Sequence, residues 1–143
     1  MAKRTATARW HGTVQDGDGR IALGQGAWEG PYSFKSRFED GDGTNPEELM
    51  AASHAGCFTM AVATALATRN YTADWLETNA NVHLRFGDQG AEIPKIELTL
   101  RGSVPDIEQE EFAELAEAAK RHCPVSKALA GVGEIVLDVQ LEA

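Results

Sequence analysis

Residues 44–69 read TNPEELMAASHAGCFTMAVATALATR, and this stretch decides the fold of the 143-residue chain. Asn45 suits the N-cap of a helix, Pro46 its first position, and Glu48 the third, from which a carboxylate can reach back to the cap. The segment beyond Glu48 is rich in alanine and almost free of charge. A helix that is apolar all round belongs to a core. We therefore predict a central helix from Pro46 to about Arg69.

Strands and further helices are expected on both sides of this helix. Alternating apolar residues and turn residues such as Asp16-Gly17-Asp18-Gly19 mark the strands. The expected strands contain residues 5–10, Ile21 and Leu23, residues 31–39, residues 82–86, residues 96–100 and residues 135–141. A second helix is expected from Ile107 to His122 with Asp106 as its N-cap, and a short one from Pro124 to Ala130. This order predicts an α+β fold with a mainly antiparallel sheet, in a single domain that spans residues 1–143.

The charge of the chain argues against several kinds of partner. The net charge is −9 and the pI is about 4.8. An acidic surface repels phosphate, so neither nucleic acid nor an anionic membrane is expected as a partner. The start, Met1-Ala2-Lys3-Arg4-Thr5-Ala6, lacks the apolar core of a secretory signal. We expect a cytoplasmic protein.

The two cysteines of the chain, Cys57 and Cys123, are candidates for redox chemistry. In the cytoplasm they are not expected to form a permanent structural bridge, and no cysteine–histidine spacing predicts a metal site. Cys57 falls within the central helix, where a buried and inert thiol is the alternative interpretation. Cys123 precedes Pro124 and so occupies a helix N-cap, which favours a thiolate. The residues alone leave open which cysteine reacts first.

Two charged residues flank the start of the central helix. Arg37 is predicted to lie on a strand over residues 31–39, facing away from Phe34 and Phe38. Glu47 lies in the first helical turn, where a carboxylate complements the helix dipole. Taken alone, both residues also fit ordinary surface positions.

Four segments together resemble the OsmC/Ohr family of hydroperoxide reductases. They are Arg37-Phe38-Glu39, Gly43-Thr44-Asn45-Pro46-Glu47-Glu48-Leu49, Ala51-Ala52-Ser53-His54-Ala55-Gly56-Cys57-Phe58 and Cys123-Pro124-Val125-Ser126. Their order and spacing match the family along essentially the whole chain. Val125, where the Ohr branch usually has tyrosine, and the position of Arg37 resemble the OsmC branch.

The resemblance implies an OsmC-like fold, an intertwined homodimer with sheets wrapped around two central helices, and a peroxidase active in oxidative and osmotic stress. It implies that Cys57 is the peroxidatic cysteine and Cys123 the resolving one. Arg37 would stabilise the thiolate, and Glu47 would orient Arg37. The substrate would be an organic hydroperoxide, the reductant a dithiol of the lipoyl type, and no cofactor would be needed.

The spacing of Glu47 and Cys57 constrains this site. Ten residues of continuous helix separate them by about 15 Å, which side chains cannot span. Either the helix is broken between them, or Glu47 serves Cys57 of the other subunit. We predict the second arrangement, in which the site lies at the dimer interface.

Two other functions fit the same fold. One is a non-catalytic dimeric module that binds a small apolar ligand and has unreactive cysteines. The other is a redox sensor that signals through its disulfide. Thiol titration with and without a hydroperoxide separates the first of these from the peroxidase.

Overall fold

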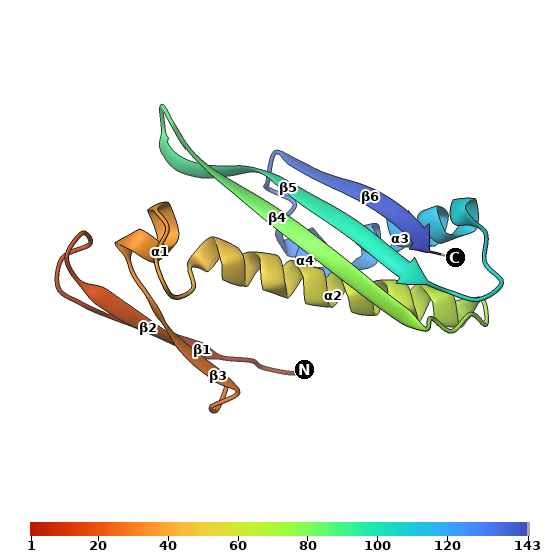
Figure 1. The fold of residues 1–143 in the computed structure, drawn as a ribbon, viewed down its shortest axis with the longest axis horizontal. Helices are drawn as coiled ribbons and strands as arrows, with labels where there is room; N and C mark the ends of the chain where they lie inside the picture. Colours follow the sequence, from red (N-terminus) through yellow and green to blue (C-terminus); the bar gives the residue numbers. More distant parts are fainter. Residues whose placement is uncertain (143) are drawn as a thin grey trace. The chain divides into compact units, whose positions relative to one another are not determined.

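A computed structural model describes residues 1–142 of the chain, which divides into two compact units, Met1–Leu49 and Met50–Ala143. The first unit contains an antiparallel sheet in the order β1-β2-β3, formed by β1 (Ala6–His11), β2 (Asp18–Leu23) and β3 (Trp28–Tyr32) (Figure 1). The expected strands at residues 5–10 and at Ile21 and Leu23 are confirmed as β1 and β2, although β2 begins within the expected turn. Position 19 of β2 needs glycine, because a Cβ there would lie 2.5 Å from the Tyr32 ring and 2.6 Å from the Trp10 ring.

The prediction of a strand over residues 31–39 is wrong. β3 ends at Tyr32, and the short helix α1 (Phe34–Phe38) follows, so Arg37 lies on a helix. Ser33 and Ser36 form a capping box, in which each side chain accepts the backbone N–H of the other. The spacing of Phe34 and Phe38, interpreted as strand alternation, places them one helical turn apart, with ring centroids at 5.0 Å.

The central helix α2 runs from Pro46 to Thr68, as predicted. Asn45 caps it, since its Oδ1 accepts the N–H of Glu48 at 2.8 Å. The side chain of Asn45 also donates to the carbonyl of Ser36 at 2.9 Å, which ties α1 to the start of α2. The expected return of the Glu48 carboxylate to the cap is wrong, because Glu48 accepts the hydroxyl of Thr44 instead, at 2.9 Å.

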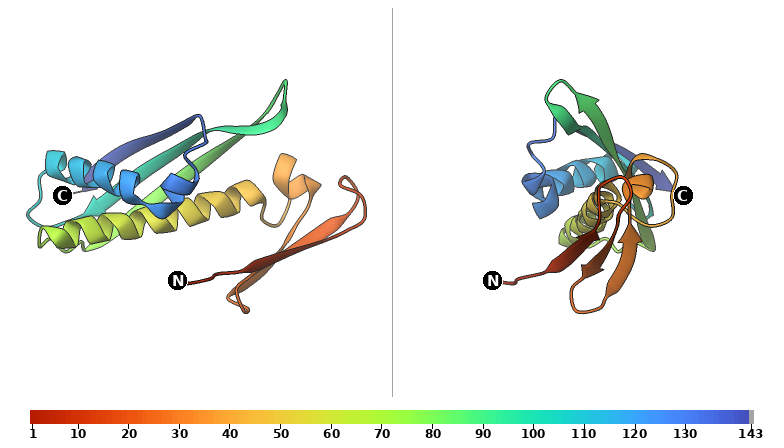
Figure 2. Two further views of the ribbon diagram at one scale, coloured as in Figure 1. Left: turned by 180° about the vertical axis from the view of Figure 1, so that it is seen from behind. Right: turned by 90° about the vertical axis from the view of Figure 1, so that its left-hand side faces the viewer.

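The second unit combines most of α2 with a sheet in the order β4-β5-β6. β4 (Trp75–Gly87) and β5 (Gly90–Ser103) are antiparallel, while β6 (Glu134–Glu142) pairs with β5 in parallel. The connection between β5 and β6 contains α3 (Gln109–His122) and α4 (Pro124–Ala128). Figure 2 shows α2, α3 and α4 on one face of this sheet.

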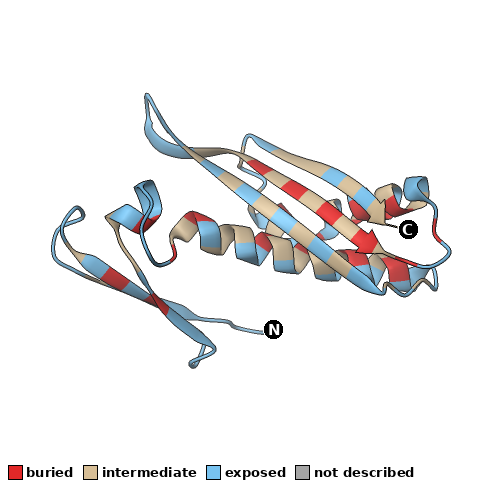
Figure 3. Cartoon of the chain, in the orientation of Figure 1, coloured by how far each residue is buried: buried red, intermediate tan, exposed pale blue. Residues whose placement is uncertain are grey.

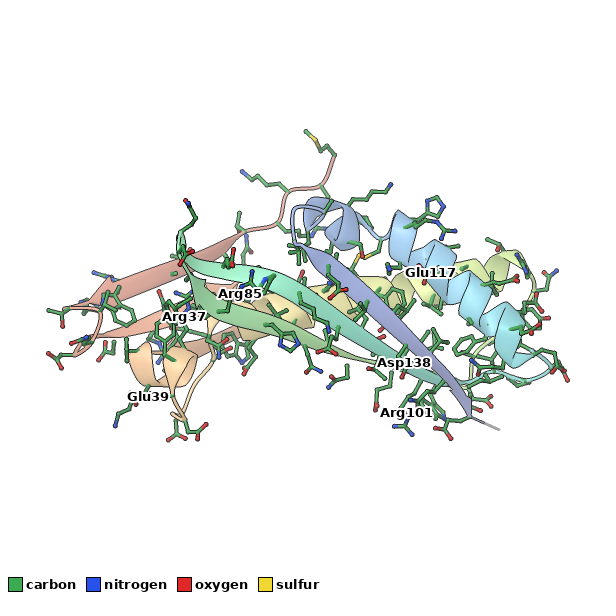
Figure 4. The ribbon with its side chains drawn as sticks, turned by 90° about the horizontal axis from the view of Figure 1, so that it is seen from above. Arg37, Glu39, Arg85, Arg101, Glu117 and Asp138 are labelled. Carbon is green, nitrogen blue, oxygen red and sulfur yellow. The ribbon has the colours of Figure 1, made fainter. Side chains whose placement is uncertain are left out.

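The core of this unit lies between the sheet and the helices. Alternate residues of β5 are buried against residues of α2 and α3 (Figure 3). The main members are Phe58, Val62, Leu66, Ile96, Leu98, Leu100, Phe112, Leu115, Ala116 and Ala119. Other positions of the sheet carry ion pairs, such as Arg85 with Glu92 at 2.6 Å and Arg101 with Glu142 at 3.2 Å (Figure 4).

The start of α3 differs from the prediction. Asp106 is not the N-cap, because its backbone adopts φ +68 and the helix begins at Gln109 after an N-cap at Glu108. Ile107, between them, is buried in the core. The Gln109 side chain bonds the backbone of β6, since it donates to the carbonyl of Val139 and accepts the N–H of Leu141.

Only one stripe of α2 is buried within the described chain. His54, Phe58, Val62 and Leu66, spaced four residues apart, are at most 1% exposed, whereas Met60 is 73% exposed. The outward face also carries small residues such as Gly56. By length and composition alone α2 would also suit a membrane span. Its buried stripe packs against β5 and α3 instead, so α2 is a core helix with one uncovered apolar face.

Candidate active site

The structure brings the two cysteines together, although 66 positions separate them in the sequence. Cys57 lies near the middle of α2 and is half-buried, and Cys123, at the junction of α3 and α4, is fully buried. Their sulfur atoms are 2.9 Å apart, and both are free thiols. A disulfide requires about 2.05 Å. Small side-chain movements therefore suffice to join them.

The backbone at the junction of α3 and α4 fixes the position of Cys123. Its backbone N–H donates to the carbonyl of Ala119 at 2.8 Å and closes α3, while Cys123 is also the N-cap of α4. Pro124 then occupies the first position of α4, as predicted. One residue thus ends one helix and starts the next, which holds the sulfur toward α2.

The two thiols differ in acidity within this unit. Burial raises the pKa of Cys57, and so does its hydrogen bond to Cys123, although the backbone of Val125 opposes the shift. Burial also raises the pKa of Cys123, but hydrogen bonds from the Cys57 thiol, from the backbone and hydroxyl of Ser126 and from the backbone of Val125 outweigh it and lower this pKa. The contacts within this unit therefore favour the negative charge on Cys123, as its N-cap position suggested.

Arg37 and Glu47 form an ion pair in the first unit. The Nη2 of Arg37 donates to Oε1 of Glu47 at 2.6 Å, and its Nε lies 3.2 Å from both carboxylate oxygens. The Glu47 side chain is 11% exposed and that of Arg37 is 37% exposed. Figure 4 shows Arg37 on α1, and its partner stands in the first turn of α2. The carboxylate can hold the guanidinium in a fixed orientation.

An apolar hollow of about 170 Å³ adjoins Arg37 in the first unit. It is lined by Trp10, Val14, Tyr32, Ser33, Phe34, Arg37 and Phe38. The guanidinium carbon lies 5.2 Å from the centre of the Phe38 ring, a cation–π contact. The hollow therefore offers a cation at the edge of an apolar surface.

A buried polar pair beside the cysteines was not identified from the sequence. His54, one turn before Cys57, lies 2.7 Å through its Nε2 from Oγ of Ser126, and both residues are buried. Each stands within a segment that carries the family resemblance, and Ser126 ends the Cys123-Pro124-Val125-Ser126 motif. Nothing in their spacing reveals that they meet.

The family pattern described as OsmC-like protein matches residues 39–138. The chain belongs to the OsmC family. It is 40% identical to "Peroxiredoxin OsmC" of Escherichia coli (strain K12) over 95% of this chain and 94% of that protein. It is 35% identical to "Organic hydroperoxide resistance protein OhrB" of Bacillus subtilis (strain 168), over 68% of this chain and 71% of the other. The expected family and its OsmC branch are confirmed, and these relatives support the expected enzyme class, a peroxidase.

Solved structures of OsmC-type proteins confirm the α+β fold. The crystal structure of OhrB from Bacillus subtilis matches with a TM-score of 0.69 at 28% identity, covering 96% of this chain and 98% of that one. An OsmC-like protein from Mycoplasma pneumoniae matches with a TM-score of 0.78 at 18% identity, covering 99% of each chain. At 18% identity, the match to the Mycoplasma pneumoniae protein supports the fold alone.

Proposed function

We propose that this protein is a thiol-dependent peroxidase that reduces organic hydroperoxides to alcohols with Cys57 and Cys123. The observation that carries the proposal is the 2.9 Å approach of the two sulfurs, one of them half-buried on α2. A non-catalytic binding module does not require two free thiols in contact. The 40% identical relative named a peroxiredoxin supports the same conclusion.

The proposed reaction begins at Cys57. Its thiolate attacks the outer oxygen of ROOH, so that an S–O bond forms as the O–O bond breaks. The alkoxide takes up a proton and leaves as the alcohol, while the sulfur becomes a sulfenic acid. The Cys123 thiolate then attacks the Cys57 sulfur, forming the disulfide and releasing hydroxide, which is protonated to water. An external dithiol, for which we propose the lipoyl type, reduces the disulfide by exchange. No metal, haem or flavin takes part.

Arg37 is proposed to act on Cys57 of the other subunit of a homodimer. Burial and the other contacts within the second unit raise the pKa of Cys57, and a nearby cation would lower it and favour the thiolate. Glu47 holds Arg37, and α2 is an unbroken helix through both Glu47 and Cys57, which leaves about 15 Å between them within one chain. The arginine of a partner chain avoids this constraint. The uncovered apolar face of α2, with Met60 at 73% exposure, supports a helix-to-helix dimer.

The hollow beside Arg37 supports an organic substrate. Its volume of about 170 Å³ compares with the cavity of about 150 Å³ that accepts benzene in an engineered protein. Aromatic rings line it, and the cation at its edge can meet the peroxide oxygens. We propose that the hydrocarbon group of the hydroperoxide occupies this hollow and that the enzyme prefers such substrates to hydrogen peroxide. A thiol cycle of this kind fits a reducing cytoplasm, the proposed location.

The first test measures turnover of cumene hydroperoxide with a dithiol and with a monothiol. Cys57→Ser should abolish turnover, and Cys123→Ser should allow one turnover and then accumulate overoxidised Cys57. Two thiols that persist after exposure to hydroperoxide would favour the ligand-binding module. Rapid disulfide formation with poor turnover under every reductant would favour a redox sensor.

A second test addresses which subunit supplies Arg37. Cys57→Ser and Arg37→Ala subunits are each inactive alone and are mixed in equal amounts. If the arginine acts across the interface, each mixed dimer has one complete site, and random pairing restores about a quarter of wild-type activity. If it acts within one chain, no mixed dimer has a complete site and the mixture stays inactive.

A further inference from the structure

A histidine with no role in the proposed reaction is buried beside the cysteines. His54 is 0% exposed, and its Nε2 lies 2.7 Å from the Oγ of Ser126. Its Nδ1 is buried and has no hydrogen-bond partner among residues 1–142. Burying a polar ring with one unpaired nitrogen costs free energy that an apolar residue would avoid. The position therefore calls for an explanation.

Ser126 connects this histidine to the proposed resolving cysteine. Cys123 is the N-cap of α4 and Ser126 is the third residue of that helix, and the backbone N–H and hydroxyl of Ser126 lower the pKa of the Cys123 thiol. These residues form one cluster, because His54 lies 2.7 Å from Ser126, Ser126 stands in the first turn of the helix that Cys123 caps, and the Cys123 sulfur lies 2.9 Å from that of Cys57. All four residues belong to the second unit of the chain.

The direction of the hydrogen bonds follows from the unpaired nitrogen. Burial lowers the pKa of His54, so the ring is neutral and carries one proton. A buried N–H without a partner is rarer than an acceptor without one, so the proton belongs on Nε2, which has a partner. Nε2–H then donates to the Ser126 oxygen, and the hydroxyl proton of Ser126 is left to donate to Cys123. In this arrangement of donors the Ser126 hydroxyl can stabilise Cys123 as a thiolate.

We propose that His54 is a positioning residue for the resolving step, which orients the Ser126 hydroxyl so that it donates to the Cys123 thiolate. The role given to Cys123 rests on the proposed function. His54 touches neither the substrate nor the sulfur, and no proton leaves it in this scheme. Its effect is to keep Cys123 charged and ready to attack the sulfenic acid on Cys57.

The decisive measurement is the thiolate titration of Cys123, read as ultraviolet absorbance in a Cys57→Ser background, where Cys123 is the only cysteine. A Cys57→Ser/Cys123→Ser protein supplies the baseline. A hydrogen bond to a charged acceptor corresponds to a roughly ten- to hundredfold change in an equilibrium. We expect His54→Leu and Ser126→Ala to lower the thiolate fraction of Cys123 about tenfold or more at pH values below its midpoint.

Two further variants make the result specific. His54→Gln places an amide N–H near the position of Nε2 and should keep the titration close to that of the parent. Thr59→Val, which removes the hydroxyl contact between α2 and Thr78 at 2.7 Å, is the matched control and should leave the titration unchanged. Circular dichroism confirms that each variant is folded.

Two results would overturn the proposal. A folded His54→Leu protein with the parent titration removes any action of His54 on Cys123. Loss of the thiolate in His54→Gln to the same extent as in His54→Leu excludes the donor role. Because this readout involves no peroxide, it remains informative even if the peroxidase function fails.

The intact two-cysteine protein provides a kinetic check. After one equivalent of cumene hydroperoxide, His54→Leu should form the sulfenic acid at the parent rate and then close the disulfide about tenfold more slowly. Dimedone, which traps sulfenic acids, should therefore label Cys57 more strongly in this variant. A slower first step with an unchanged second one contradicts the assignment.

Discussion

Replacing Glu47 with glutamine tests how much the proposed peroxidase depends on the orientation of Arg37. The substitution keeps the shape of the side chain but removes the charge that receives contacts at 2.6 Å and 3.2 Å. A charge-assisted pair of this kind is worth about 1.5–3 kcal/mol when shielded from water. Arg37 is 37% exposed, so solvent screening brings the value to the lower end of that range or below it. A loss of about 1–2 kcal/mol corresponds to a decrease of roughly five- to thirtyfold in the oriented population.

The assay is kcat/KM for cumene hydroperoxide under excess dithiol, and we expect it to decrease by that factor in Glu47→Gln. Glu48→Gln is the matched control, because Glu48 stands in the same helical turn but bonds Thr44 at 2.9 Å and not Arg37. The control should change kcat/KM by less than about twofold. Equal losses in both variants, or no loss in Glu47→Gln, would refute the orienting role.

Three predictions concern stability, measured at fixed protein concentration. Phe58→Ala should reduce the free energy of unfolding in urea by about 3–5 kcal/mol, since Phe58 is fully buried, and a loss below about 1 kcal/mol would contradict its place in the core. Asn45→Ala should cost about 1–2 kcal/mol, because Asn45 caps α2 and also bonds Ser36, and an unchanged urea midpoint would speak against that cap. The pKa of Glu111 is lowered, and the largest cause is the hydrogen bond that its carboxylate accepts from the Tyr71 hydroxyl. The stability from this contact is present above the ordinary glutamate pKa of about 4.3 and is lost as pH falls through the lowered value, so Tyr71→Phe should weaken the acid dependence of the melting temperature.

The central helix could be predicted from the sequence because its signals are local. Asn45, Pro46 and the alanine-rich run each act within one or two helical turns, and α2 begins and ends within one residue of the prediction. The segment around Arg37 could not be predicted in the same way. Phe34 and Phe38 fit either a strand or a helix, and the Ser33–Ser36 capping box decides for the helix.

The contacts between the cysteines and between His54 and Ser126 join residues far apart in the sequence. No local sequence pattern predicts such contacts. Cys57 and Cys123 meet because β6 pairs in parallel with β5, which requires a crossover that carries α3 and α4 onto the face occupied by α2. The resemblance supplied the pairing of these cysteines. It did not supply the contact between His54 and Ser126, which are 72 positions apart.

The distance between the two cysteines along the sequence has a thermodynamic consequence. A bond between them would close a loop of 66 positions and reduce the entropy of the unfolded chain, which corresponds to about 4 kcal/mol in the loop-closure estimate. The oxidised protein should therefore melt at a higher temperature than the reduced one. In the proposed cycle each reduction by a dithiol would return the chain to its less stable form, so the balance of oxidised and reduced protein would set the stability of the fold.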